Sequence, residues 1–226
     1  MLRYLITGTG HSGTGYAAEL LRRNGVECTH ERYMCGEWQD VEAPAESSWM
    51  VARALASDPL IEYSRVLHLV RHPLMVLRSW HATRETRNDY ARWMRETFPE
   101  LNALDGLDRL IRRYLLWHDM IERDAPNGRR TVRTVPVESG PQAILWALGI
   151  GRTSDWHEPR INIKVENDDE PFWQWSDLPD TPDRWRLQHL ADRYGYGAVD
   201  VEMERALREK KEEPAEEVAD APEVDP

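Results

Sequence analysis

The stretch LRYLITGTGHSGTGYAAELLRR, residues 2–23, decides the fold. Residues 2–7 form a short apolar run, which predicts a buried strand that ends at Gly8. Residues 14–23 predict a helix, because their apolar side chains recur on one face at helical spacing. The glycine-rich loop of residues 8–15 joins the two elements. A strand, a glycine loop and a helix in this order favour an α/β architecture.

Strands and helices alternate along the first 150 residues. Further strands are predicted at 26–29, 65–70 and 131–137, and helices at 49–57, from 73 onward, and at 87–97, 105–124, 140–148 and 181–194. Ser47-Ser48 is the predicted cap of the 49–57 helix, whereas 33–46 reads as a loop and 161–165 as an extended piece. The alternation predicts a three-layer α/β fold with a mainly parallel sheet of about four to five strands and helices on both faces. With the glycine loop after its first strand, this fold resembles the P-loop type. Ligands of such folds bind at the carboxyl ends of the strands.

Length and charge predict one domain with an acidic tail. We expect an α/β domain over residues 1–198, then a helix and a disordered tail within 199–226. From Glu212 onward the chain has seven acids and no base, so the net charge of −11 becomes −4 without this segment. Such a mildly acidic body gives no support for nucleic-acid binding.

The cysteines and the apolar stretches indicate the compartment. Cys28 and Cys35 are too far apart for a CxxC redox pair, and no second pair exists for a zinc site. No stretch is apolar enough for a signal peptide or a membrane span. We therefore expect a cytoplasmic protein that has no membrane partner. The sequence does not indicate the oligomeric state.

The loop Gly8-Thr9-Gly10-His11-Ser12-Gly13-Thr14-Gly15 is a candidate anion site. Glycines let the backbone turn its N–H groups inward. The start of the following helix adds N–H groups without partners and a partial positive charge. The hydroxyls of Ser12 and Thr14 can donate as well. A glycine loop can also be a plain tight turn, but its place between a strand and a helix favours anion binding.

The anion is expected to bind without a metal ion. Gly8 and Gly13 keep the spacing of the Walker A pattern G-x-x-x-x-G-K-[ST], but Thr14 stands where its lysine belongs. A nucleoside triphosphatase also needs a carboxylate for magnesium after a neighbouring strand. The predicted strand 65–70 is followed by Arg71-His72-Pro73, which offers cations instead.

Two motifs, in order, resemble those of the sulfotransferase family. The run TGTGHSGTGY, residues 7–16, resembles its 5′-phosphosulfate-binding loop, which reads roughly [KR]-S-G-T-[TG] after the first strand. The run RVLHLVRHPLMVLRSW, residues 65–80, resembles its 3′-phosphate-binding motif, with an arginine and, eight residues later, a serine. The resemblance is strong over roughly residues 1–80 and faint to about 197. It implies a sulfotransferase that uses 3′-phosphoadenosine 5′-phosphosulfate as co-substrate.

The resemblance implies which residues hold this co-substrate. They are Gly10, His11, Ser12, Gly13, Thr14, Gly15, Tyr16, Arg71 and Ser79. Arg71 and Ser79 would grip the 3′-phosphate, to which a guanidinium offers a rigid fork of donors. The alternative for Arg71 is a structural ion pair. Tyr16 would lie near the adenine, and it could equally be part of the core.

Catalytic roles follow from the same resemblance. His11 stands where the family usually carries Lys or Arg, and histidine supplies a full charge only when protonated. Glu31 matches the position of a glutamate that acts as the base in several branches, and His30 is the runner-up. The alternative for Glu31 is an ordinary loop carboxylate. Members that act on phenols and steroids use a histidine placed further on, and the sequence does not show whether His68 or His81 corresponds to it.

The expected reaction is transfer of the sulfuryl group to a hydroxyl or amine of a small-molecule or glycan-like acceptor. Three alternatives remain open. A small-molecule kinase on a P-loop fold would need ATP and magnesium, and the missing lysine argues against it. A phosphoadenosine-binding protein could have lost catalysis, which His11 makes credible. An interaction protein would use the fold and the acidic tail without any nucleotide.

Overall fold

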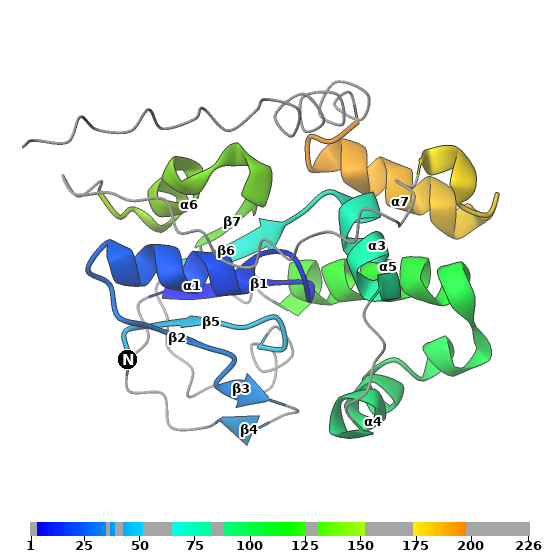
Figure 1. The fold of residues 1–226 in the computed structure, drawn as a ribbon, viewed down its shortest axis with the longest axis horizontal. Coiled ribbons are helices and arrows are strands. Elements are labelled where there is room, and N and C mark those ends of the chain that lie inside the picture. The colour runs from blue at the N-terminus through cyan, green and yellow to red at the C-terminus, as the bar shows by residue number, and fades with distance from the viewer. Residues whose placement is uncertain are drawn as a thin grey trace, which may run out of the picture.

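A five-stranded parallel sheet forms the centre of the protein (Figure 1). The computed structural model describes residues 4–34, 37–38, 43–51, 65–82, 88–124, 131–151 and 174–197. In spatial order the strands are β2 (Cys28–His30), β5 (Ala45–Ser47), β1 (Tyr4–Gly8), β6 (Arg65–Val70) and β7 (Thr131–Pro136). A separate antiparallel pair consists of β3 (Tyr33–Met34) and β4 (Glu37–Trp38). The predicted α/β class, with a parallel sheet of this size, is confirmed.

β1 lies in the middle of the sheet and is covered on both faces. Leu5 and Ile6 point to opposite faces, and both are fully buried. Strands of this kind read as continuous apolar runs, which is why the sequence reveals them. If the five strands of this sheet alone are counted along the chain, their order in space is second, third, first, fourth and fifth. The chain therefore leaves β1 toward one edge of the sheet and later crosses to the other edge. Ligands of open α/β sheets bind at such a reversal, beyond the carboxyl ends of the strands.

Helices cover both faces of the sheet and complete three layers (Figure 1). One face carries α1 (Thr14–Arg23) and α6 (Pro141–Leu148). The other carries α5 (Gly106–Asp124) with α4 (Asn88–Thr97), α3 (Pro73–Ala82) and α7 (Pro182–Arg193). Short 3₁₀ helices precede α5, α6 and α7, namely η1 (Pro99–Ala103), η2 (Val137–Ser139) and η3 (Trp175–Asp177).

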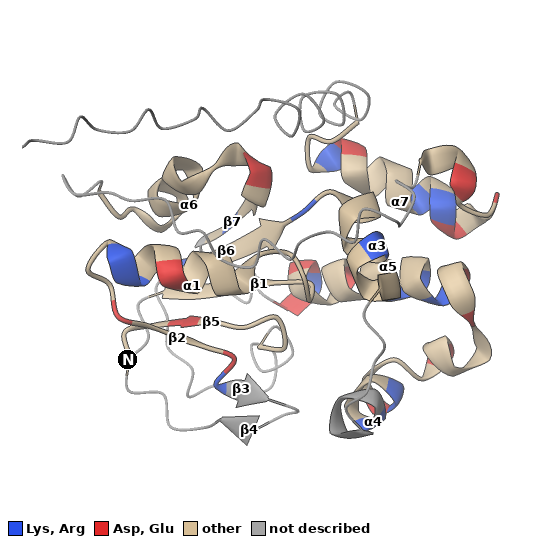
Figure 2. Ribbon diagram, viewed as in Figure 1, with Lys and Arg blue, Asp and Glu red and all other residues tan. Residues whose placement is uncertain are grey.

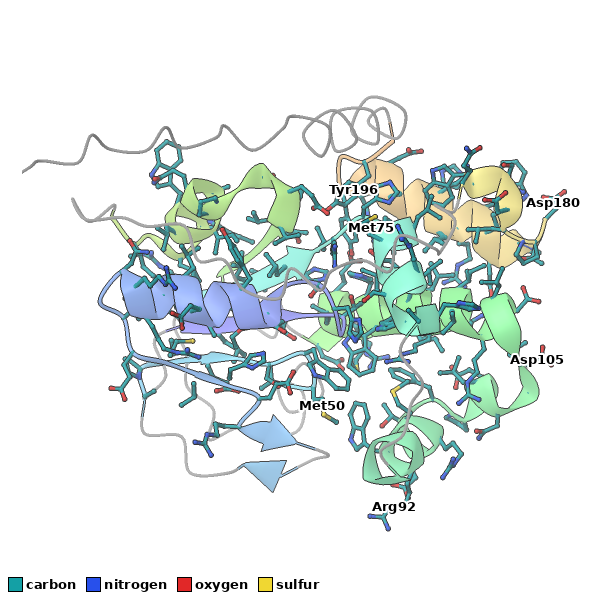
Figure 3. The ribbon with its side chains drawn as sticks, viewed as in Figure 1. Met50, Met75, Arg92, Asp105, Asp180 and Tyr196 are labelled. Carbon is teal, nitrogen blue, oxygen red and sulfur yellow. The ribbon has the colours of Figure 1, made fainter. Side chains whose placement is uncertain are left out.

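Trp117 on α5 connects the core to the end of β1. Its ring centroid lies 5.0 Å from that of Trp49 and 5.6 Å from that of Trp93. The same buried cluster contains Met50, which Figure 3 labels. The indole N–H of Trp117 donates to the carbonyl oxygens of Gly8 and Trp49, each at 3.1 Å. The aromatic core therefore fixes the point at which the glycine loop begins.

Ion pairs hold α7 against α5. Figure 2 shows charges of both signs on these two helices, whereas β1 carries none. The pairs that link them are Arg112–Asp183, Arg186–Asp119 and Arg193–Glu122. They place the end of α7, with Tyr194 and Tyr196, beside the carboxyl end of the sheet. Within the described ranges, no helix combines the length and the apolar character that a membrane span needs.

Two local predictions are wrong. Residues 33–46 read as a loop, but they contain β3 and β4 and most of β5. Ser47-Ser48 was expected to cap a helix, but Ser47 ends β5 and residues 48–51 form bends and a turn. β5 has only three residues, Ala-Glu-Ser, so no local period marks it as a strand. Residues 52–57, 161–165 and 199–226, which carry the other predictions for these regions, lie outside the described residues.

Candidate anion-binding site at the glycine loop

The glycine loop leads from β1 into α1, as the sequence predicts. Gly13 precedes α1 with φ 97°, and His11 has φ 67°, so both residues adopt left-handed backbone conformations. Left-handed residues in a loop of this kind turn successive N–H groups toward a common point. Gly8 has no room for a side chain, because a Cβ there would overlap the Leu69 carbonyl oxygen and Ser12 Oγ. The chain can pass this close to β6 only with glycine at position 8.

Two hydroxyl groups of the loop are buried without a partner. Thr9 Oγ1 and Ser12 Oγ make no hydrogen bond to any described residue, and both residues are 0% exposed. Buried polar atoms are nearly always hydrogen-bonded, so these two need an explanation. The first N–H groups of α1 also lack intrahelical acceptors, and Gly13 supplies no side-chain cap. The helix start therefore supplies N–H donors of the kind that bind anions, and the two hydroxyls lie buried beneath it.

The loop is tied to the neighbouring strands at both ends. Trp117 holds the Gly8 carbonyl group where the loop begins. At the other end, Ser47 Oγ of β5 donates to the Thr14 carbonyl oxygen at 2.8 Å. The geometry of the loop is therefore set by α5 and β5, which lie far from it in the sequence.

Arg71 and Ser79 both contact the loop at His11. Arg71 Nη1 donates to the His11 carbonyl oxygen at 3.2 Å, and Ser79 Oγ lies 2.5 Å from His11 Nδ1. Tyr114 donates to the Arg71 carbonyl oxygen at 3.0 Å and so fixes its backbone. Within the described residues, the Arg71 guanidinium makes no other hydrogen bond and no ion pair. Most of its donors are therefore left for a ligand, although its role in binding stays a prediction.

Glu138 closes the site on the side of β7. Its two carboxylate oxygens accept from the His72 backbone N–H at 3.2 Å and from the Tyr196 hydroxyl at 2.6 Å. Figure 3 shows Tyr196 between the end of α7 and the segment after β7. Burial, with Glu138 nearby, raises the pKa of Tyr196. Sequence reasoning missed this contact, because its partners lie 58 residues apart.

Glu31 and His30 lie at the exit of the edge strand β2. His30 Nε2 is 3.6 Å from Glu31 Oε1, and both side chains are partly exposed. Burial lowers the pKa of His30, and the Glu31 charge opposes this effect. One strand, β5, separates β2 from β1, so strand spacing puts this turn about 10 Å from the axis of β1. The two residues lie at the same edge of the sheet as the loop, and their catalytic role stays a prediction.

Glu46 is a buried carboxylate that the sequence did not single out. Glu46 is 0% exposed and lies in β5, the strand between β1 and β2. Its carboxylate accepts from the Thr29 hydroxyl and, at 2.9 Å, from the Arg32 backbone N–H. Among the residues that the structure describes, no three His, Cys, Asp or Glu side chains are grouped so that they could hold a metal ion.

Trp80 is a second residue that the sequence reasoning missed. It follows Ser79 on α3 and is 5% exposed, and its Nε1 has no hydrogen-bond partner among the described residues. This nitrogen lies 3.5 Å from the position that a Cβ on Gly10 would take. The Arg113 guanidinium carbon lies 4.0 Å from the centroid of the Trp80 ring. The indole N–H therefore lies against the loop, as an unused donor next to the candidate site.

Tyr16 and His68, two residues considered in the sequence analysis, both lie against the core. Tyr16 is partly buried and packs against the cluster between α1, α6 and the sheet. This contact favours the core alternative for Tyr16, and adenine binding stays untested. His68 is 1% exposed, and its Nε2 lies 2.9 Å from Nδ1 of the fully buried His118. Burial lowers the pKa of His68 to about 3 and that of His118 well below its usual value. His68 is therefore a core residue and is not accessible to an acceptor.

No protein-family model and no curated protein matches this chain. The function is therefore inferred from the residues at the glycine loop and from the motifs that surround them.

Proposed function

We propose that the protein binds 3′-phosphoadenosine 5′-phosphosulfate at the glycine loop and transfers its sulfuryl group to an acceptor hydroxyl or amine. One observation carries the proposal. His11, Arg71 and Ser79, which the resemblance assigns to the two phosphate groups of the co-substrate, meet within hydrogen-bond distance at the start of α1. Between 60 and 68 residues of chain separate them from His11, so their meeting is a property of the fold.

The electrostatics of the loop support an anionic ligand. The N–H groups at the start of α1 and the guanidinium of Arg71 are hydrogen-bond donors. Arg71 has no carboxylate partner among the described residues, so a phosphate dianion would not have to displace one. A guanidinium in this state matches the paired oxygens of a phosphate better than an ammonium group would.

The proposed chemistry balances without any further reactant. The acceptor oxygen or nitrogen attacks sulfur in line, and the bond from sulfur to the bridging oxygen breaks. The electron pair of that bond stays on the 5′-phosphate, where the loop N–H groups and His11 stabilise the charge that develops. Glu31 takes the proton of the acceptor. Arg71 and Ser79 hold the 3′-phosphate and so fix the position of the sulfur atom.

The state of His11 is linked to Ser79. Ser79 Oγ lies 2.5 Å from His11 Nδ1, and either atom can be the donor, according to the tautomer or charge of the ring. A histidine supplies a full charge only when it is protonated, so a neutral His11 gives the leaving phosphate less charge than Lys or Arg would. The histidine at this position favours, as a second candidate function, a phosphoadenosine-binding protein with weak or no transfer activity.

Thermal unfolding with two nucleotides, together with an assay of sulfuryl transfer, tests the proposal. We expect 3′,5′-phosphoadenosine without magnesium to stabilise the fold by about 2.7 kcal/mol at 100 times its dissociation constant. For a chain of this size that is a shift of about 5–11 °C in Tm. A melt that millimolar ligand leaves unmoved would refute the proposal. A shift with ATP and magnesium alone would favour a kinase, and binding of phosphoadenosine without measurable transfer would favour the second candidate.

A further inference from the structure

Glu46 occupies an unusual place for a carboxylate. It is the central residue of β5, and its register partners are Leu5 on β1 and Thr29 on β2. Register partners share a face, so Glu46 lies on the same face of the sheet as the buried Leu5. Burial of a carboxylate is costly unless its oxygens accept hydrogen bonds. Here the Thr29 hydroxyl donates to one oxygen of Glu46, and the Arg32 N–H donates to the other.

These bonds determine the shape of the turn after β2. Glu31 has φ 57°, a left-handed conformation that is unfavourable for residues other than glycine. Its N–H donates to the Ser47 carbonyl oxygen at 3.1 Å. The next N–H, of Arg32, donates to Glu46 Oε1 at 2.9 Å. Two successive donors of the turn are therefore held by the end of β5, which maintains the strained backbone.

The same end of β5 holds the glycine loop. Ser47 Oγ donates to the Thr14 carbonyl oxygen at 2.8 Å, and the Ser48 N–H donates to the Ile6 carbonyl oxygen at 2.9 Å. β5 therefore connects the start of α1 with the turn that carries Glu31. An acceptor placed between the two would depend on this connection for its distance from both.

We infer that Glu46 is a positioning residue that holds Glu31 and His30 toward the loop. Its carboxylate is 0% exposed, so it cannot itself reach an acceptor. The inference deepens the proposed function and rests on it for the role of Glu31 as base. The geometric part, that Glu46 fixes the turn, stands on the contacts of Glu46 with Thr29 and Arg32 and can be tested without any substrate.

The His30 imidazole provides the measurement. Its Nε2 is 3.6 Å from Glu31 Oε1, so the Glu31 charge raises the pKa of His30, against the effects of burial and of Arg22. An NMR titration of the full chain gives this pKa, with His30→Asn identifying the resonance. Glu31→Gln should lower the pKa of His30 in the otherwise unchanged protein. The size of that decrease measures how closely Glu31 is held to His30.

Two substitutions of Glu46 separate its bonds from its volume. Glu46→Gln keeps an oxygen that can accept from the Arg32 N–H, whereas Glu46→Met fills similar space without an acceptor. When Glu31→Gln is combined with Glu46→Gln, we expect it to keep most of its effect on the pKa of His30. When it is combined with Glu46→Met, it should lose more than half of that effect. Hydrogen exchange of the Arg32 amide should accelerate at least tenfold in Glu46→Met and much less in Glu46→Gln.

Controls make the outcomes distinct. The coupling is the effect of the Glu31 charge on the pKa of His30. Ser47→Ala removes a buried hydroxyl from the same strand, but Ser47 contacts the turn through its carbonyl group, so the coupling should persist. Thr29→Val removes the other donor to Glu46 and should reduce the coupling even if Glu46→Met fails to fold. An unchanged coupling in either Glu46→Met or Thr29→Val would overturn the inference. Loss of coupling in a protein that does not bind phosphoadenosine would support the geometric part of the inference, that Glu46 fixes the turn, and would refute the proposed function.

Discussion

Substitution of Arg71 separates a ligand contact from a structural one. The guanidinium donates to the His11 carbonyl oxygen at 3.2 Å, and the proposal gives its other donors to the 3′-phosphate. Arg71→Ala removes both contacts. Adenosine 5′-phosphate has no 3′-phosphate, so its affinity should report only the structural contact, whereas 3′,5′-phosphoadenosine should report both.

The structure gives the expected size of each effect. Both contacts involve the charged guanidinium, and hydrogen bonds to charged groups contribute about 1.5–3 kcal/mol. Loss of the contact to the His11 carbonyl oxygen should therefore weaken both ligands equally, by a factor of no more than about 150. Loss of the phosphate contact should weaken 3′,5′-phosphoadenosine by a further factor of about 10–150.

Isothermal titration calorimetry at fixed ionic strength measures both affinities. Arg71→Lys keeps the charge but not the fork, and its loss for 3′,5′-phosphoadenosine should be intermediate. Arg133→Ala is the matched control, because it removes the same charge from an exposed position on β7 and should change neither affinity beyond a factor of about 2. Equal losses for the two ligands in Arg71→Ala would show that Arg71 acts only on the loop and would refute its role in the 3′-phosphate site.

Two further predictions concern proton transfer and acid stability. Glu31→Gln should lower the turnover of sulfuryl transfer by about 10²–10⁴-fold with little change in phosphoadenosine affinity. His30→Ala should lower turnover much less. The reverse ranking in steady-state kinetics would assign the role of general base to His30. In the core, the folded protein takes up a proton on His68 only near pH 3, whereas the unfolded chain does so near pH 6.5, so stability must fall as the pH falls through this range. Between pH 7 and pH 5, His68 alone should cost about 2 kcal/mol in urea unfolding, and a His68→Leu/His118→Phe double variant with the same pH dependence as the parent would contradict this assignment.

Much of the protein could be predicted from local sequence. The apolar run before Gly8, the helical period after Thr14 and the run 65–70 each identify an element by themselves. These signals are strong because β1 and β6 are buried on both faces, so most of their residues are apolar. The glycines of the loop also indicate an anion site, since their backbone conformation is a local property.

β5 could not be found from local sequence. Its three residues include a carboxylate, and they become a strand only because β1 and β2 bond it from both sides. Glu46 can be buried there because Thr29 and Arg32, 17 and 14 residues away, bond its oxygens. Strand pairing of this kind depends on long-range contacts and leaves no period in the sequence.

The sequence alone therefore determined the α/β class, the glycine loop and the residue types available to bind an anion, since each follows from neighbours within a few positions. The tertiary structure decided which of those residues meet. Trp117 reaches Gly8 across 109 residues, Arg71 and Ser79 reach His11 across 60 and 68, and Tyr196 reaches Glu138 across 58. Such contacts arise when the parallel strands bring their carboxyl ends to one edge and the helices pack around it, and no local pattern encodes that packing.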